Sequence, residues 1–144
     1  MILKTIAIAI LTALACSVTP AFAGDPHGVW ISADRDTKVR IGDCGGKLCG
    51  RVVWLKEPID PATGKPKTDK ENPDATKQRR PLVGLQVING MQASGRDIWQ
   101  GQIYNADDGK TYAASLELQS HARARVEGCV MSVLCKAQTW TRAN

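Results

Sequence analysis

Aromatic residues are scarce in this chain of 144 residues, and histidine is scarcer still. Phe, Trp and Tyr together make up 5% of the sequence, and there are two histidines, His27 and His121. Neither histidine lies in a recognisable motif, and Ser115 and Ser132 lack the glycine elbow of serine hydrolases. No glycine-rich phosphate loop and no HExxH metal motif is present. The sequence therefore predicts a protein that is not an enzyme and that has no cofactor and no bound metal.

Long apolar runs are also missing, with one short exception at the amino terminus. Lys4 precedes an apolar stretch over residues 6–16, and Pro20 precedes the small-x-small ending at Ala23. A membrane-spanning helix needs about 20 apolar residues, so this stretch is typical of a cleaved secretory signal peptide over residues 1–23, with a retained anchor as the alternative. We expect residues 24–144 to form a single domain without a transmembrane segment, periplasmic or secreted.

A strong excess of charge of one sign is absent as well. The formal net charge of +5 falls to +4 when Lys4 leaves with the leader. The basic side chains are spread among the expected turns and strands, whereas a nucleic-acid-binding protein presents a clustered basic face. We therefore expect no nucleic-acid partner.

Short runs rich in Val, Ile, Trp, Tyr and Thr, separated by Gly, Asp, Asn and Ser, fill the chain after the leader. No stretch has a helical period, so the chain is predicted to be all-β. Eight one-sided antiparallel strands joined mainly by tight turns favour an eight-stranded up-and-down barrel, because closing the sheet removes its exposed edges; a two-sheet sandwich is the alternative. The expected strands are residues 28–33, 37–44, 49–57, 82–91, 97–105, 110–120, 122–130 and 135–142.

The alternation of apolar and polar residues is clearest in two of these strands. In the strand at 110–120, one face is formed by Tyr112, Ala114, Leu116 and Leu118. In the strand at 122–130, the apolar face is formed by Ala124, Val126 and Val130. Each strand is therefore predicted to turn one face to a shared interior and the other to water.

Residues 58–81 are the exception to the strand pattern. This segment contains five prolines and charges of both signs, with no apolar period. Loops of this length inside a compact domain are usually functional or flexible insertions. Asp69, Asn72 and Arg80 could form a polar site within it, or they could hold the loop in place through hydrogen bonds of its own.

Four cysteines follow the leader, and an even number in an exported chain predicts disulfides. Zinc is the weaker interpretation, because zinc ligand pairs usually lie two to four residues apart. In an up-and-down barrel, consecutive turns alternate between the two rims. The turn with Cys44 and Cys49 therefore lies far from the turn with Cys129 and Cys135, and bridged Cα atoms must lie within about 7 Å. We expect the local pairs, Cys44 with Cys49 and Cys129 with Cys135.

The same geometry brings the two ends of the barrel sequence together. Trp30 lies near the start of the first strand and Arg142 near the end of the last, and closure makes these strands neighbours. A guanidinium stacked on an indole contributes about 0.5–2 kcal/mol and would close that end. In the alternative, the two residues are unrelated and Arg142 points into solvent.

The interior of such a barrel is either filled by side chains or holds one small ligand. Trp54, Trp99, Tyr112 and Leu116 are the predicted wall of a cavity, with residues 58–81 as its lid at the rim away from Trp30. The predicted function is a binding module for a small apolar or amphipathic ligand. The alternative is a cell-envelope interaction protein whose filled barrel acts through its loops.

Several short motifs give the chain a resemblance to a known family. They are GVW at 28–30, CGGKLCG at 44–50, DKENPD at 69–74, RRPLVGL at 79–85, YNADDGKTY at 104–112 and QTWTR at 138–142. With these motifs the chain resembles domain-of-unknown-function family 2147, which implies a small exported bacterial protein. Gly28, Trp30 and Arg142 also give a wider resemblance to lipocalin-like barrels, although a second lipocalin motif and a carboxyl-terminal helix are absent from the sequence.

Overall fold

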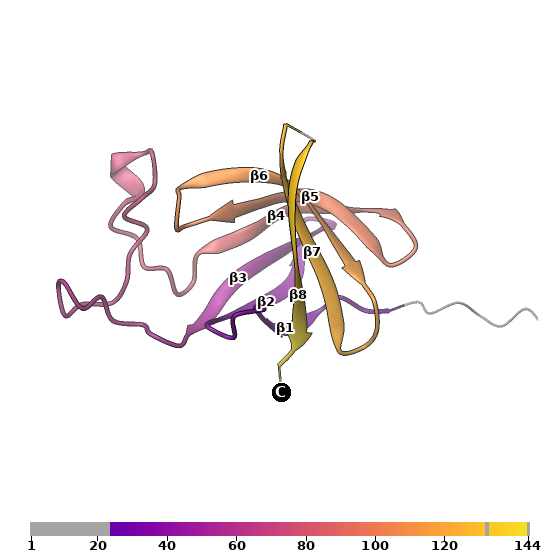
Figure 1. The fold of residues 1–144 in the computed structure, drawn as a ribbon, viewed down its shortest axis with the longest axis horizontal. Helices are drawn as coiled ribbons and strands as arrows, with labels where there is room; N and C mark the ends of the chain where they lie inside the picture. The colour runs from indigo at the N-terminus through magenta and orange to yellow at the C-terminus, as the bar shows by residue number, and fades with distance from the viewer. Residues whose placement is uncertain (1–23, 132, 144) are drawn as a thin grey trace, which may run out of the picture.

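The computed structural model describes residues 24–131 and 133–143, so the predicted signal peptide, residues 1–23, lies outside the described residues. The described residues form a closed antiparallel barrel in which each strand pairs with the next and β1 pairs with β8 (Figure 1). The up-and-down barrel is confirmed, rather than the sandwich. Its strands are β1 (Gly28–Ile31), β2 (Thr37–Cys44), β3 (Lys47–Leu55), β4 (Gln86–Gly95), β5 (Ile98–Asn105), β6 (Lys110–Leu118), β7 (Arg123–Val130) and β8 (Leu134–Arg142).

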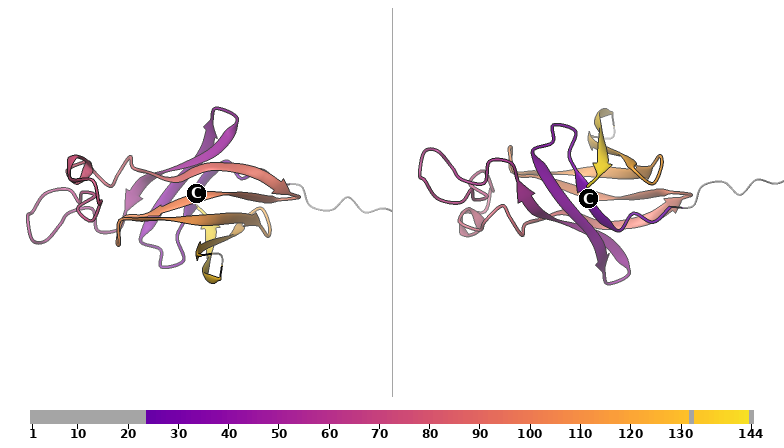
Figure 2. Two further views of the ribbon diagram at one scale, coloured as in Figure 1. Left: turned by 90° about the horizontal axis from the view of Figure 1, so that it is seen from above. Right: turned by 90° about the horizontal axis from the view of Figure 1, so that it is seen from below.

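One long connection, between β3 and β4, extends from one end of the barrel (Figure 2). It contains two isolated antiparallel bridges, Ile59 with Pro66 and Thr68 with Pro81. It also contains the short 3-10 helix η1 (Ala75–Lys77), whose N-cap residue is Asp74. No helix in the described part of the chain is long and apolar enough to cross a bilayer.

Among the strands, β4 differs most from its expected bounds: the prediction was 82–91, and the strand is Gln86–Gly95. The Leu85 N–H donates to the Leu82 carbonyl at 3.0 Å, and Gly84 has a φ of 96°. This turn is fixed to β3, because the Gly84 N–H donates to the Val52 carbonyl at 2.7 Å. The apolar segment Leu82–Leu85 therefore bends across the end of the barrel before the strand begins, a conformation that Gly84 permits.

Both disulfides form as expected. Cys44 and Cys49 bridge the β2–β3 hairpin with a Cα–Cα distance of 5.8 Å, across the turn glycines at 45 and 46, whose φ values are 61° and 82°. Cys129 and Cys135 bridge the β7–β8 hairpin with a Cα–Cα distance of 4.0 Å. Two disulfides are compatible with an exported protein, since oxidising compartments preserve them.

The core fills one end of the barrel. Trp30, Ile88, Met91 and Leu116 are its largest fully buried apolar side chains. Alternation in β6 is as predicted, with Ala114, Leu116 and Leu118 buried. The predicted inward position of Val130 is wrong, because that side chain is 44% exposed. The β7–β8 hairpin continues past the short pairing of β1 with β8, so its far end has no opposite wall to pack against.

Trp30 and Arg142 close this filled end, as the sequence predicts. They are register partners, and the Arg142 guanidinium carbon lies 4.3 Å from the centroid of the indole ring. The guanidinium donates to the carbonyls of His121, His27 and Asp25 at 2.6, 2.7 and 2.9 Å. A Cβ atom at position 28 would lie 2.8 Å from Arg142 Nη1, which explains the glycine there.

His27 forms a small ionic cluster beside this closure. Its Nδ1 pairs with Asp25 and its Nε2 lies 3.0 Å from Asp43 Oδ1, while the guanidinium of Arg142 is a nearby positive charge. The hydrogen bonds with Asp25 and then Asp43 raise the pKa of His27 above 6.5. The His27 hydrogen bonds also lower the pKa of Asp25. The imidazolium is therefore the form that the fold favours.

We expect His27→Gln to destabilise the protein at about pH 5.5 but much less at about pH 8.5. A raised pKa means that the folded state holds the proton more tightly. The contribution of His27 is therefore complete below pH 6.5 and is lost as pH rises through the folded pKa. Urea unfolding at both pH values tests this. An equal loss at both pH values would contradict the ionic role.

Candidate functional site

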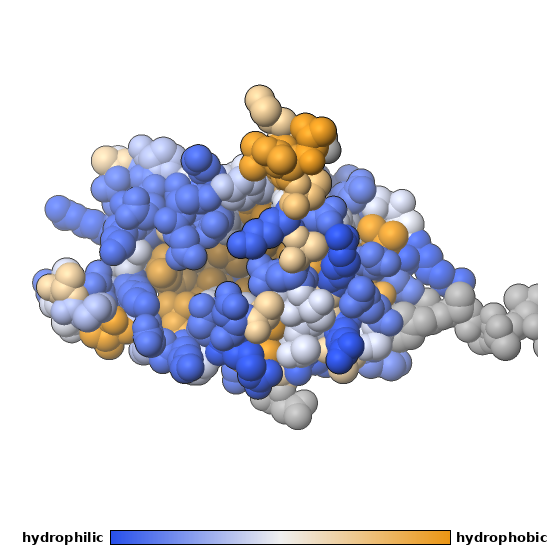
Figure 3. Space-filling model, in the orientation of Figure 1, coloured by the Kyte–Doolittle hydropathy of each residue, from blue (hydrophilic) through white to orange (hydrophobic). Residues whose placement is uncertain are grey.

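The end of the barrel opposite Trp30 and Arg142 is hollow. A cavity of about 510 Å³ lies there, bounded by strands β2, β3, β4, β5 and β8 and by the loops at that rim. In Figure 3 an orange recess is bordered by blue, hydrophilic side chains. The apolar residues that line the cavity are Val39, Val52, Leu55, Leu82, Leu85, Val87, Ile103, Tyr104, Ala106 and Trp140.

The rim of this cavity is polar. Side chains from the β1–β2 turn, the long loop, the β5–β6 turn and β8 surround the opening, and they are Ser32, Asp34, Asp36, Lys56, Glu57, Lys67, Asn105, Asp107 and Gln138. Inward-facing strand residues supply an apolar floor because the strands alternate, and the connections supply charged residues because they meet water. An apolar pocket with a charged rim suits a ligand with an apolar body and a polar head group.

The predicted wall residues lie elsewhere in the barrel. Trp54 is wrong as a wall residue: it is 39% exposed, with the Lys38 ammonium 5.1 Å from its ring centroid. Trp99 and Leu116 are register partners, half-buried and fully buried, in the filled part of the core. Tyr112 is half-buried and donates its hydroxyl proton to the Asp108 carboxylate outside the cavity lining.

Trp140 is the tryptophan that lines the hollow, and the sequence reasoning did not select it. It is buried, and its indole N–H has no hydrogen-bond partner among the described residues. The signal that could have found it is register: Trp140 faces Ala124 on β7, and both are inward-facing. A buried donor without a partner costs about 1–3 kcal/mol, so the unpaired indole N–H of Trp140 is energetically unfavourable.

Asp69, Asn72 and Arg80 do come together, and Tyr104 completes the cluster. Asp69 Oδ2 accepts from Arg80 Nε at 3.0 Å, Arg80 Nη2 at 2.9 Å and Asn72 Nδ2 at 2.8 Å, and Asp69 Oδ1 accepts from the Tyr104 hydroxyl at 2.6 Å. Asp69 is fully buried. Burial, followed by the hydrogen bond to Asp69, raises the pKa of Tyr104, so the phenol remains a donor. The carboxylate is fully occupied by its own neighbours.

The cluster fastens the long loop to the rim of the barrel. Tyr104 pairs with the exposed Thr111 and lines both the cavity and a hollow outside the barrel, so it lies at the rim between the two. A Cβ atom at Gly109 would lie 1.9 Å from the Glu71 carbonyl oxygen, so the loop touches the backbone of the β5–β6 turn directly. Within the predicted lid, 58–81, only Lys67 reaches the cavity lining. The loop is thus an anchored wall of the rim.

A second hollow of about 670 Å³ lies outside the barrel, between this loop and the outer faces of β3 to β6. Arg51, Lys77 and Arg80 line it. Two of these cations have carboxylate partners, since Arg80 pairs with Asp69 and the Lys77 ammonium lies 3.9 Å from Asp74. The groove is polar and only weakly cationic.

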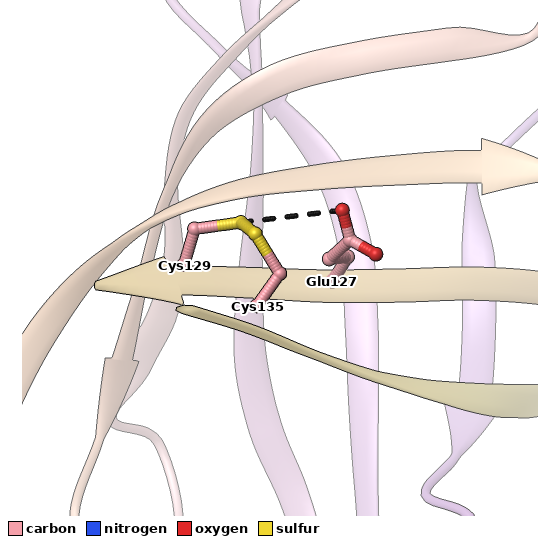
Figure 4. Close-up of side chains that lie close together, drawn as sticks. All are labelled: Glu127, Cys129 and Cys135. Carbon is pink, nitrogen blue, oxygen red and sulfur yellow. Dashed lines mark hydrogen bonds between the residues drawn. A yellow bond between two sulfur atoms is a disulfide. The ribbon is translucent and has the colours of Figure 1, made fainter. Parts of the chain in front are cut away.

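Three potential metal ligands lie close together on the β7–β8 hairpin. Atoms of Glu127, Cys129 and Cys135 all lie within 4.8 Å of one another (Figure 4). The two sulfurs form a disulfide and offer no thiolate, and the Glu127 carboxylate, 4.0 Å from Cys129 Sγ, is paired with Arg125. A disulfide sulfur has no proton to donate, so the 4.0 Å contact is not a conventional hydrogen bond. The oxidised hairpin therefore lacks the thiolates that a zinc site needs.

A closed eight-stranded barrel with one filled and one hollow end defines a lipocalin-like architecture. A solved structure with this architecture is protein HP1028 from Helicobacter pylori, which is described as belonging to the lipocalin family. It matches with a TM-score of 0.67 and 21% identity over 83% of this chain and 84% of that chain. The chain itself belongs to the family described as "Uncharacterized protein conserved in bacteria (DUF2147)", whose model matches residues 28–142. No curated protein matches the chain.

Proposed function

We propose that this protein is a periplasmic or secreted binding module for a small amphipathic ligand, and that it is not an enzyme. The observation that supports the proposal is the cavity of about 510 Å³ at the open end of the barrel. Ligand pockets in proteins typically have volumes of about 300–1,000 Å³ and mainly apolar linings with a few polar groups. The cavity falls in this range of volume, and about half of its lining residues are apolar, with the polar and charged ones gathered at the rim. The most buried carboxylate in the described part of the chain, Asp69, is occupied by structural hydrogen bonds.

The lining also supports the amphipathic character of the ligand. Ten apolar residues line the cavity, while charged residues lie at the opening, and these are Asp34, Asp36, Glu57, Asp107, Lys56 and Lys67. A hydrocarbon body would leave water for the floor and contribute about 0.8 kcal/mol for each buried CH₂ group. Its head group would stay hydrated at the rim. An acceptor atom inserted beside Trp140 would in addition satisfy the unpaired indole N–H.

Ile103→Trp tests the site directly. Ile103 is half-buried and lines the cavity, so a larger side chain there fills the hollow with little disturbance of the core. We expect dansyl-undecanoic acid to bind the natural chain, and we expect the Kd for Ile103→Trp to be at least about tenfold higher, a loss of about 1.4 kcal/mol. Fluorescence titration of the dansyl group measures both constants.

Val53→Trp is the matched control. Val53 lies one residue from the cavity-lining Val52 and is 37% exposed, so the added ring projects outward. Its Kd should remain within about twofold of that of the natural chain, because the floor is unchanged. Equal affinity in both variants would place the probe outside the barrel and refute the assignment of the cavity.

A second candidate function is a cell-envelope interaction through the loops. It is favoured by the rigid anchoring of the long loop, whose outer groove of about 670 Å³ presents Arg51 and Lys77 to the surroundings. Arg51→Ala with Lys77→Ala separates the two functions, because both residues line the outer groove and neither lines the cavity. Capture of a partner would then be lost, whereas the affinity for the dansyl probe would change only moderately.

A further inference from the structure

The far end of the β7–β8 hairpin is an exposed apolar projection. Met131, Val133 and Leu134 are 87%, 81% and 74% exposed, and Val130 is 44% exposed. In Figure 3 the end of the β7–β8 hairpin stands out as an orange projection at the top of a mostly hydrophilic surface. Apolar groups gathered in this way on a soluble protein mark a site that meets another apolar surface.

The hairpin stands clear of the barrel in a fixed shape. All four residues from Leu134 to Ala137 are exposed, although inward and outward positions alternate along a strand, so neither face of this part of β8 is covered. The Cys129–Cys135 disulfide ties the two strands together directly below the apolar end. The projection is therefore preorganised, which lowers the entropic cost of inserting it into a partner.

The sequence of the hairpin end favours a lipid surface with anionic head groups over an apolar groove in a protein. Between Glu127 and Arg142 the sequence has one charged residue, Lys136, directly below the tip, and no acidic residue. Residues 24–144 carry a formal net charge of +4, because Lys4 lies in the predicted leader. A convex apolar end with a basic residue behind it matches the depth profile of a membrane, with acyl chains inside and phosphates at the boundary.

The position of the hairpin relative to the cavity also favours a membrane. The β7–β8 turn lies at the same end of the barrel as the β1–β2 turn and the long loop, since turns alternate between the rims. Gln138 at the base of the hairpin lines the cavity, and its Oε1 accepts from the Ala33 N–H at 3.5 Å. Insertion of the tip would bring the opening of the barrel close to the lipid.

We propose that the apolar tip formed by Val130, Met131, Val133 and Leu134 docks the protein on anionic membranes, with Lys136 at the phosphate level. Docking itself does not depend on the cavity binding a ligand. Exchange of an amphipathic molecule between lipid and barrel would follow from docking and rests on the proposed function. Membrane docking would account for the exposure of these apolar side chains, which the packing of the barrel does not explain.

Co-sedimentation with vesicles tests the docking. The full protein is mixed with vesicles of phosphatidylglycerol and phosphatidylcholine, and the bound fraction is measured against lipid concentration. Val133→Ser with Leu134→Ser should lower the partition coefficient by about tenfold, because it removes two of the three most exposed apolar side chains of the tip. Lys136→Ala should lower binding to the mixed vesicles about fivefold and leave binding to pure phosphatidylcholine unchanged.

The matched control replaces two exposed apolar residues outside the hairpin. Ile59 and Val83 are each 47% exposed, and Ile59→Ser with Val83→Ser should leave the partition coefficient unchanged within about twofold. Far-UV circular dichroism verifies that each variant is folded, and dansyl-undecanoic acid titration reports the cavity separately. No binding of the natural chain to vesicles would overturn the docking proposal. So would equal losses in tip and control variants, or a dimer in lipid-free solution that the tip substitutions disperse.

Discussion

Asp69→Ala is expected to lower the free energy of unfolding by about 3 kcal/mol. The Asp69 carboxylate is fully buried and accepts from Arg80, Asn72 and Tyr104. Removing it leaves the Asn72 amide and the Tyr104 hydroxyl with unsatisfied donors in a buried setting, whereas Arg80 is exposed enough to regain water. Urea unfolding measures the loss, and faster tryptic cleavage of residues 58–81 reports release of the loop.

Asp74→Ala is the control for that experiment. Asp74 lies in the same loop and caps η1 through the Thr76 N–H at 3.0 Å, but it is exposed. Losing this cap should cost about 1 kcal/mol or less. If Asp69→Ala were no more destabilising than Asp74→Ala, the buried cluster would not be what holds the loop.

Trp30→Ala is expected to destabilise the barrel by about 3–5 kcal/mol. Trp30 is fully buried, donates its indole N–H to the Pro26 carbonyl at 2.9 Å and supports the Arg142 guanidinium on its face. The substitution leaves a cavity where β1 and β8 meet, and these strands have only two register pairs. The transition midpoint in urea should fall accordingly.

Two further variants identify the origin of this loss. Arg142→Lys keeps the charge but not the planar fork that serves three backbone carbonyls, so it should cost about 1–2 kcal/mol. Trp54→Ala removes the same side chain from the outer surface and should cost less than about 1 kcal/mol. A similar loss for Trp30→Ala and Trp54→Ala would contradict the closure of the barrel at Trp30.

The fold could be predicted because its signals are local. Apolar alternation in residues 110–118 fixed which face of β6 turns inward, and Gly45 with Gly46 fixed the β2–β3 hairpin. The alternation of turns between two rims then predicted both disulfides, and it placed Trp30 and Arg142 at the same end of the barrel, where the structure shows them stacked. Each of these inferences needs only the direction of the chain and the strand period.

The lining of the cavity could not be predicted in the same way, because it depends on depth along the barrel. The strand period assigned Leu116 and Trp99 to the interior but gave no sign that they lie in the filled end. Trp54 follows a register shift between β2 and β3 at Lys38 and Val39, which turns its side chain outward. A β-bulge of this kind changes the face that a residue occupies without changing the sequence pattern.

The polar loop was harder still to interpret from sequence. Asp69, Asn72 and Arg80 were recognised as a group, but their fourth partner, Tyr104, is distant in sequence and comes from β5.

Apolar residues near the turns were equally ambiguous. Val130 continues the inward pattern of β7, yet it lies beyond the point at which β1 covers β8. The exposure of Val130 therefore depends on where the opposite wall of the barrel ends, and the lengths of β1 and β8 set that limit.

The central claim is that the hollow end of the barrel holds an amphipathic ligand. Native mass spectrometry of the protein purified from the cells that make it tests this claim most directly. The account predicts a non-covalent adduct of one small molecule per chain, present in the natural chain and in Val53→Trp and absent from Ile103→Trp. A bare chain in every preparation, with no added mass after incubation with dansyl-undecanoic acid, would contradict it.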